Sequence, residues 1–370
     1  MNSLSNKFGV NAKPTLADVA KLAGTSLASA SRVLNPGINT ARVRKPIREK
    51  VIRAARMLGY VPNLPARALA GKKANAIGYL IASEPNTRFG LAERIISHLA
   101  IEAKKANYDF LLRAVAVNEE DVNLAAHYKD MIQSGRVDIA IVDGEFVSDV
   151  EMHHLLNMGF PFVIVTSAIR QMTGRVPVIM FDNRRAFAEA TEYLLELGHR
   201  KIAVIARPML KTQSEDRWRF LVEEEKIAGY RDALKAAGLQ YDSKLVVEGN
   251  RTNFRKTAQA VRKLLKYASS LTAILATDDV LAVQVIRVLS QLGYSVPKDI
   301  SIIGFNDSPI ASQLIPALTT VKLPIRKYAK LIIQQANDVL RNVDNNKETQ
   351  YPWIRLSCRL IIRQSTAPVF

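Results

Sequence analysis

Cysteine is almost absent from this 370-residue chain: Cys358 is the only one, so no disulfide can form within one molecule. A chain without structural disulfides is typical of a reducing compartment. Long apolar runs are also missing. No stretch reaches the length needed to cross a membrane, and the first residues, MNSLSNKFGVNAKP, lack the apolar core of a signal peptide. We therefore expect a soluble, cytoplasmic protein without membrane contacts.

The sequence also lacks the usual signatures of catalysis and cofactor binding. It contains no GxxxxGK or GxGxxG loop, no GxSxG elbow, no HExxH and no CxxC. Among the histidines only the adjacent pair His153-His154 is close in sequence, and it suits a helix surface. Asp278-Asp279 could form a paired carboxylate site, but adjacent residues at a strand end usually point apart. We predict no enzyme, no cofactor and no metal.

Acidic residues are scarce where basic ones are dense. Residues 1–73 hold 14 Lys or Arg but only Asp18 and Glu49, so this segment carries +12 of the total net charge of +18. A solvated basic face is the ordinary explanation of a charge run. An excess so unevenly placed on one small unit favours a polyanion such as DNA as the partner.

The stretch TLADVAKLAGTSLASASRVLN, residues 15–35, predicts two short helices joined at Gly24. Thr15 and Asp18 suit a capping box on the first helix, and either Thr25 or Ser26 can cap the second. The outer face of the second helix carries small, hydroxylated or cationic groups, which suit base edges and phosphates in a major groove: Ser26, Leu27, Ala28, Ser29, Ser31 and Arg32. An ordinary helical hairpin is the alternative.

A third helix is predicted from Pro46 to about Leu58, because proline suits a first helical turn and Gly59 can end the helix. Its apolar stripe would close a three-helix core. The next segment, NLPARALAGKKA (63–74), suits a short helix capped by Asn63, which would be marginal alone in water. A plain linker between domains is the alternative.

From Asn75 onward, apolar strands alternate with amphipathic helical segments. Strands such as AIGYLIA and DIAIVDG are apolar throughout, which is typical of parallel sheets covered on both faces. Two such series predict two doubly wound α/β lobes with a ligand cleft outside the strand ends.

Three stretches in order, TLADVAKLAGTSLASASRVLN, REKVIRAARMLGYVPN and ARALAGKK, resemble the headpiece and hinge of the lactose/galactose repressor family of bacterial transcription regulators. The similarity extends to Thr366 and implies that each lobe is discontinuous, with lobe 1 at about 75–179 and 309–341 and lobe 2 at about 180–308 and 342–370. It implies an α + α/β fold: a disordered tail over 1–13, a helix-turn-helix domain over 14–62, a hinge helix over 63–74, and a two-lobed core like that of periplasmic binding proteins over 75–370.

The resemblance assigns DNA contacts to individual positions. Leu27 and Ala28 fall where the family reads bases, and without donors they would read apolar groups such as thymine methyls. Arg32 takes the place of the arginine that contacts bases or phosphates. Leu69, with Ala66 beside it, matches the hinge leucine that wedges into the minor groove. The remaining candidates for DNA contact are Thr15, Ser26, Ser29, Ser31, Asn35, Tyr60 and Asn63.

The resemblance also implies a small carbohydrate-like effector between the lobes. Asp279 matches the family aspartate that accepts hydrogen bonds from ligand hydroxyls, Lys226 replaces the usual arginine, and Arg251 replaces an aromatic ring. The two cations favour a sugar acid or a phosphorylated sugar, unless they point to solvent or pair with Glu223–Glu225. Further candidates near the expected cleft are Ser83, Arg88, Thr166, Arg170, Asp182-Asn183 and Asn306-Asp307.

Together these features predict a homodimeric repressor of carbohydrate-use genes, whose affinity for a near-palindromic operator the effector controls. Alternatively the ligand could act as a corepressor, which uses the same domains but raises the affinity for the operator and does not lower it. A solute-binding protein would share the two-lobed core but would need an export signal and no basic headpiece. No leucine heptad follows Thr366, which favours a dimer over a tetramer built in that way.

Overall fold

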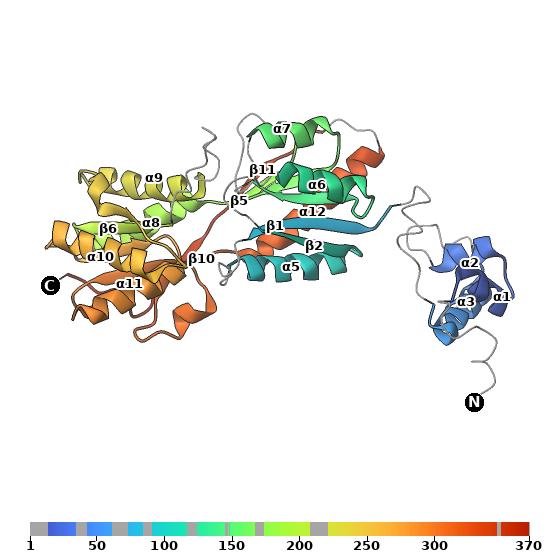
Figure 1. The fold of residues 1–370 in the computed structure, drawn as a ribbon, viewed down its shortest axis with the longest axis horizontal. Coiled ribbons are helices and arrows are strands. Elements are labelled where there is room, and N and C mark those ends of the chain that lie inside the picture. The colour runs from blue at the N-terminus through green and yellow to red at the C-terminus, as the bar shows by residue number, and fades with distance from the viewer. Residues whose placement is uncertain are drawn as a thin grey trace. The chain divides into compact units, whose positions relative to one another are not determined.

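The computed structural model describes residues 14–34, 43–60, 73–83, 91–116, 124–144, 147, 149–166, 174–207, 221–345 and 349–369. The chain forms two compact units, Met1–Ala74 and Asn75–Phe370. The described part of the first unit is helical, and the second is built on two sheets (Figure 1). The expected tail and nearly all of the expected hinge lie outside the described residues.

The described residues of the first unit pack three helices around a small core: α1 (Leu16–Leu22), α2 (Leu27–Leu34) and α3 (Lys45–Leu58). The predicted capping box on α1 is confirmed. Asp18 N donates to Thr15 Oγ1 (3.3 Å), and Thr15 N donates to Asp18 Oδ2 (2.8 Å). Gly59 (φ +62°) ends α3 in the left-handed conformation, as predicted. The fully buried side chains of this core are Val19, Ala30 and Val51.

The first sheet of the second unit has the strand order β11-β5-β4-β3-β1-β2, and all of its pairs are parallel. Its strands are β1 (Ala76–Ser83), β2 (Asp109–Ala116), β3 (Ile139–Asp143), β4 (Phe162–Val165), β5 (Val178–Phe181) and β11 (Trp353–Leu356). Two pairs of helices cover its two faces: α5 (Leu91–Lys105) with α12 (Ile325–Asp344), and α6 (Leu124–Gln133) with α7 (Asp149–Asn157) (Figure 1).

The second sheet has the order β12-β10-β9-β8-β6-β7, and only the β10–β12 pair is antiparallel. Its strands are β6 (Ile202–Ala206), β7 (Val246–Glu248), β8 (Ala273–Ala276), β9 (Ser301–Asn306), β10 (Thr319–Lys322) and β12 (Arg359–Ile361). It is covered by α8 (Asn183–Glu196) with α9 (Leu221–Ala236), and by α10 (Phe254–Tyr267) with α11 (Asp279–Gln291).

These two sheets confirm the predicted doubly wound lobes, and the burial explains why the sequence showed them. Every residue of β3, β4, β6 and β8 is buried, because helices cover both faces of each sheet. A strand with two buried faces has no reason to alternate polar and apolar residues.

Two of the expected lobe limits are corrected by the strand pairing. β10 pairs with β9 in the second sheet, so residues 309–322 belong with lobe 2 and not with lobe 1. β11 pairs with β5 in the first sheet, so residues 353–356 belong with lobe 1. The periodicity of a segment indicates that it is a strand, but not which sheet it joins.

Candidate functional site

Helix α2 buries Ala30 against the headpiece core and leaves three of the predicted DNA-contacting side chains exposed. Leu27 is 53% exposed, and Ala28 and Arg32 are also exposed on this helix. Ser26 caps the helix, since its Oγ accepts a hydrogen bond from Ser29 N (3.2 Å). A large apolar side chain kept in solvent on the same short helix as a cation suits contact with base edges and phosphates.

The other residues predicted to contact DNA divide into two groups. Ser29 and Ser31 are half-buried on α2, and Thr15 is exposed with its hydroxyl in the capping box. Tyr60 packs against the headpiece core, and burial raises the pKa of its phenol. The residues outside the described part of the chain are Asn35, Asn63, Ala66 and Leu69, so the hinge wedge stays a prediction.

In the second unit, buried polar side chains gather where β6, β8 and β9 end. These strands are parallel neighbours in the order β9-β8-β6, so their carboxyl ends meet at one edge of the sheet. Ligands of open α/β sheets bind outside such edges, because loops and helix N-termini converge there. Arg207 follows β6, Asp278 lies two residues beyond β8, and Asn306 ends β9.

Glu223 on α9 is the centre of the first part of this cluster. Its Oε1 accepts from Arg207 Nε (2.8 Å) and from Lys226 Nζ (3.2 Å). Lys226 also donates to Thr277 O (2.8 Å) and lies over the ring of Phe305, 4.3 Å from its centroid. Burial alone would raise the pKa of Glu223, but the two cations lower it to about 2.

This geometry decides between the two interpretations of Lys226 in favour of pairing. Lys226 is 3% exposed, and a carboxylate, a carbonyl and a ring surround its ammonium group. Its charge is therefore balanced by Glu223, one of the partners considered from the sequence. The spacing of Glu223 and Lys226, three residues apart on one helix, was the available signal.

Asp278 is the centre of the second part of the cluster. It caps α11, its Oδ1 accepting from Val280 N (2.8 Å). Its Oδ2 accepts from Asn306 Nδ2 (3.1 Å) and from Arg251 Nη1 (3.4 Å). Gln284 Nε2 holds the carbonyl of Arg251 (2.8 Å), which fixes that loop against α11. The structure thus brings Arg251 and Asn306 together on one carboxylate.

Asp279 is enclosed on the opposite side and points away from Asp278, as expected for adjacent residues. Its Oδ1 accepts from Thr320 Oγ1 (2.5 Å), and its Oδ2 accepts from Ser308 N (2.6 Å) and Ser308 Oγ (2.8 Å). It is 1% exposed, and burial raises its pKa to about 6. This geometry favours a structural role for Asp279, joining α11 to β10, and makes Asp278 the better candidate for ligand hydroxyls.

The first lobe offers fewer of the predicted contacts. Thr166 (φ +73°) follows β4, and its N–H donates to Tyr328 Oη (3.1 Å). Asp143, which sequence reasoning missed, ends β3 and accepts from Tyr79 Oη (3.3 Å). Its place as the one charged residue at the end of an apolar strand was the available signal. The side chain of Ser83 is not described, and Arg88 and Arg170 lie outside the described residues.

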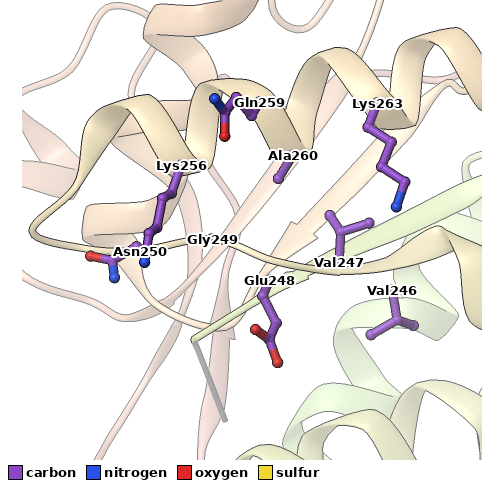
Figure 2. A pocket seen from close by; sticks show the side chains of 9 residues that line it. All are labelled: Val246, Val247, Glu248, Gly249, Asn250, Lys256, Gln259, Ala260 and Lys263. Carbon is purple, nitrogen blue, oxygen red and sulfur yellow. The ribbon is translucent and has the colours of Figure 1, made fainter. Parts of the chain in front are cut away.

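A groove of about 570 Å³ lies elsewhere, between the edge strand β7 and helix α10. Lys263 extends from α10 toward β7 and Lys256 toward the following loop at Asn250, whereas the carboxylate of Glu248 points away (Figure 2). Both lysines are exposed, and Val246, Val247 and Ala260 supply the apolar lining. Its exposed charged groups contrast with the buried, convergent ones at the strand ends, so we take the strand-end cluster as the candidate effector site.

Two further findings concern groups considered from the sequence. His199 is buried and hydrogen-bonds Thr272 Oγ1 (2.9 Å) and Ala367 O (3.1 Å), and burial lowers its pKa. No group of three His, Cys, Asp or Glu able to hold a metal occurs among the described residues. Within the same part of the chain, no helix is both long and apolar enough to cross a bilayer.

A helical headpiece with an exposed helix face and a two-lobed α/β core are the two parts expected of a regulator that couples DNA binding to ligand binding. Residues 15–63 match the family model "Bacterial regulatory proteins, lacI family", and residues 191–366 match the model "Periplasmic binding protein-like domain". The HTH-type transcriptional regulator CelR of Thermobifida fusca is 31% identical over 331 residues, covering 87% of this chain and 92% of the relative. The chain belongs to the LacI family of bacterial regulatory proteins.

Other comparisons agree with this assignment. DegA of Bacillus subtilis is 30% identical and covers 96% of this chain and 99% of the relative. A solved CelR–cellobiose complex has a TM-score of 0.67 at 27% identity, covering 95% of this chain and 99% of that one. The Lac repressor dimer bound to operator has a TM-score of 0.75 at 24% identity, covering 96% and 100%, and at that identity it shows the fold alone.

Proposed function

We propose that this transcriptional regulator is a homodimeric repressor of carbohydrate-use genes, acting in the cytoplasm on a near-palindromic operator. The observation that carries the proposal is the buried polar cluster around Asp278 at the carboxyl edge of the second sheet. A small sugar-like effector bound beside this cluster would control operator affinity. The protein is a DNA-binding regulator by family membership, and we propose no catalytic role.

Two α2 helices, one from each protomer, would enter successive major grooves of the operator. Leu27 and Ala28 would meet thymine methyls, and Arg32 would meet a base edge or a phosphate. Supporting this, all three side chains are exposed, although the core of the headpiece lies directly beneath the helix. The basic excess of residues 1–73 would supply the non-specific attraction to phosphates.

The charge balance of the cluster favours a neutral effector over the anionic one that the sequence suggested. Arg207 and Lys226 share the carboxylate of Glu223, and Arg251 pairs with Asp278, so each of these cations already has an anionic partner within the protein. A sugar brings hydroxyls that can donate to Asp278 and accept from Asn306 without adding charge. In the related CelR complex the bound compound is cellobiose, a neutral sugar.

A thermal-shift screen against neutral sugars, sugar acids and sugar phosphates tests this proposal. A neutral sugar is expected to raise Tm, because a ligand specific for the native state stabilises it by mass action. Asn306→Ala should reduce the shift, whereas Gln291→Ala, which removes an exposed amide at the end of α11, should keep it. A shift caused only by acids or phosphates would contradict the neutral effector, and no shift at all would contradict a sugar effector.

A further inference from the structure

We propose that Arg94 is a positioning residue of the effector site: it ties helix α5 of the first lobe to the turn of the second lobe that carries Asn306. Its loss should weaken effector binding without any direct contact to the effector. The part of the inference that concerns effector binding rests on the proposed function, whereas the tie between the lobes does not.

The tie consists of two hydrogen bonds from one guanidinium nitrogen. Arg94 Nη1 donates to Asn306 O (2.9 Å) and to Asp307 O (2.9 Å). Arg94 lies in the first turn of α5, which packs on the first sheet, while Asn306 ends β9 of the second sheet. Among the described residues Arg94 pairs with no carboxylate, so this contact is not an ordinary surface ion pair. A cation that donates to two carbonyls makes stronger bonds than a neutral donor would.

The turn that Arg94 holds has an unusual backbone. Asn306 (φ +106°) and Asp307 (φ +46°) are consecutive non-glycine residues with positive φ. Such conformations persist only where the surroundings fix them, and they gather at ligand sites and switches. The second lobe fixes one side of the turn, because Asp307 Oδ1 accepts from Arg363 Nη2 (2.7 Å). Arg94 fixes the other side from the first lobe.

Asn306 connects this tie to the effector site. Its carbonyl accepts from Arg94, while its side-chain amide donates to Asp278 Oδ2 (3.1 Å), beside Arg251. The direction of the amide depends on the backbone of the turn. Any change in lobe arrangement that breaks the Arg94 contact therefore alters the orientation of Asn306 in the site. This gives a direct physical link between effector binding and movement of the first lobe.

Hydrogen exchange of the ligand-free, full-length protein tests the tie itself. Arg94→Ala should raise exchange at the amides of Asp307 and Ser308 about tenfold, because the turn loses its support from the first lobe. Lys104→Ala removes an exposed cation from the same helix and should leave these amides unchanged. Arg94→Lys keeps the charge and should give an intermediate rate, since lysine lacks the planar fork of arginine. Equal exchange in Arg94→Ala and wild type would overturn the proposal.

Calorimetric titration then tests the link to the effector, using the neutral sugar that raises the wild-type Tm. We expect affinity about tenfold weaker in Arg94→Ala and unchanged in Lys104→Ala. The double variant Arg94→Ala, Asn306→Ala should bind no more weakly than Asn306→Ala alone, because Arg94 acts through Asn306. If Arg94 had a purely structural role, the losses of affinity from the two substitutions would add, and this result would overturn the proposed link between Arg94 and the effector site. If no sugar binds wild type, the effector proposal fails, and the exchange experiment alone decides the role of Arg94.

Discussion

Replacing Glu223 with glutamine should destabilise the second lobe strongly, because it leaves two cations without their shared carboxylate. Glu223 and Lys226 are each 3% exposed, and Arg207 completes the trio. The pKa of Glu223 falls from its ordinary 4.5 to about 2, which corresponds to about 3 kcal/mol of stability at neutral pH. Breaking a buried ion pair by removing one partner typically costs about 3–5 kcal/mol. We therefore expect Glu223→Gln to lower the unfolding free energy by about 3 kcal/mol.

Urea unfolding followed by circular dichroism measures this loss, with Glu224→Gln as the matched control. Glu224 is exposed one residue further along the same helix, and its replacement should change stability by less than about 0.5 kcal/mol. Because the folded-state pKa of Glu223 is depressed, its contribution is present above pH 4.5 and is lost as the pH falls toward 2. The difference in unfolding free energy between variant and wild type should become smaller over that pH range. A gap below about 1 kcal/mol at pH 7 would refute the reasoning.

Three further predictions concern stability. Thr15→Ala should lower the unfolding free energy of the headpiece by about 1 kcal/mol, measured by thermal unfolding, because the capping box with Asp18 is lost. The wild-type protein should lose stability as the pH falls below 6.5, because burial lowers the folded-state pKa of His199 and the unfolded chain therefore binds a proton more readily than the folded one. His199→Gln should remove this loss of stability at low pH. Gly229→Ala should cost about 3 kcal/mol in urea unfolding, because its Cβ would collide with the backbone carbonyl of Arg184 where α8 and α9 pack closely.

Much of the fold could be predicted from the sequence because burial leaves a local pattern. The apolar runs of β3, β6 and β8 indicate strands covered on both faces, and Gly59 indicates the end of a helix. The partner of a strand leaves no such pattern. β10 and β11 were assigned to the wrong lobes because each lies beside a crossover, where only pairing across the sheet decides membership.

The candidate effector site was predicted in position but not in detail. The sequence placed Lys226, Arg251 and Asp279 near the strand ends, and the first two do lie in the polar cluster. It left open whether Lys226 contacts the effector or pairs with Glu223–Glu225, because the partner of a buried cation depends on its neighbours in space. The sequence also favoured Asp279 over Asp278 as the contact for effector hydroxyls. The two residues are adjacent, and only the direction of each side chain distinguishes their roles.

The central claim, that the protein is a dimeric, sequence-specific DNA-binding regulator under effector control, is tested most directly by selecting binding sites from a random duplex library with the full-length protein. The selection should enrich one near-palindromic sequence with two half-sites, and the neutral sugar that raises Tm should change the affinity for it. Enrichment of no sequence, or of a single unsymmetrical site with affinity indifferent to the sugar, would contradict the account.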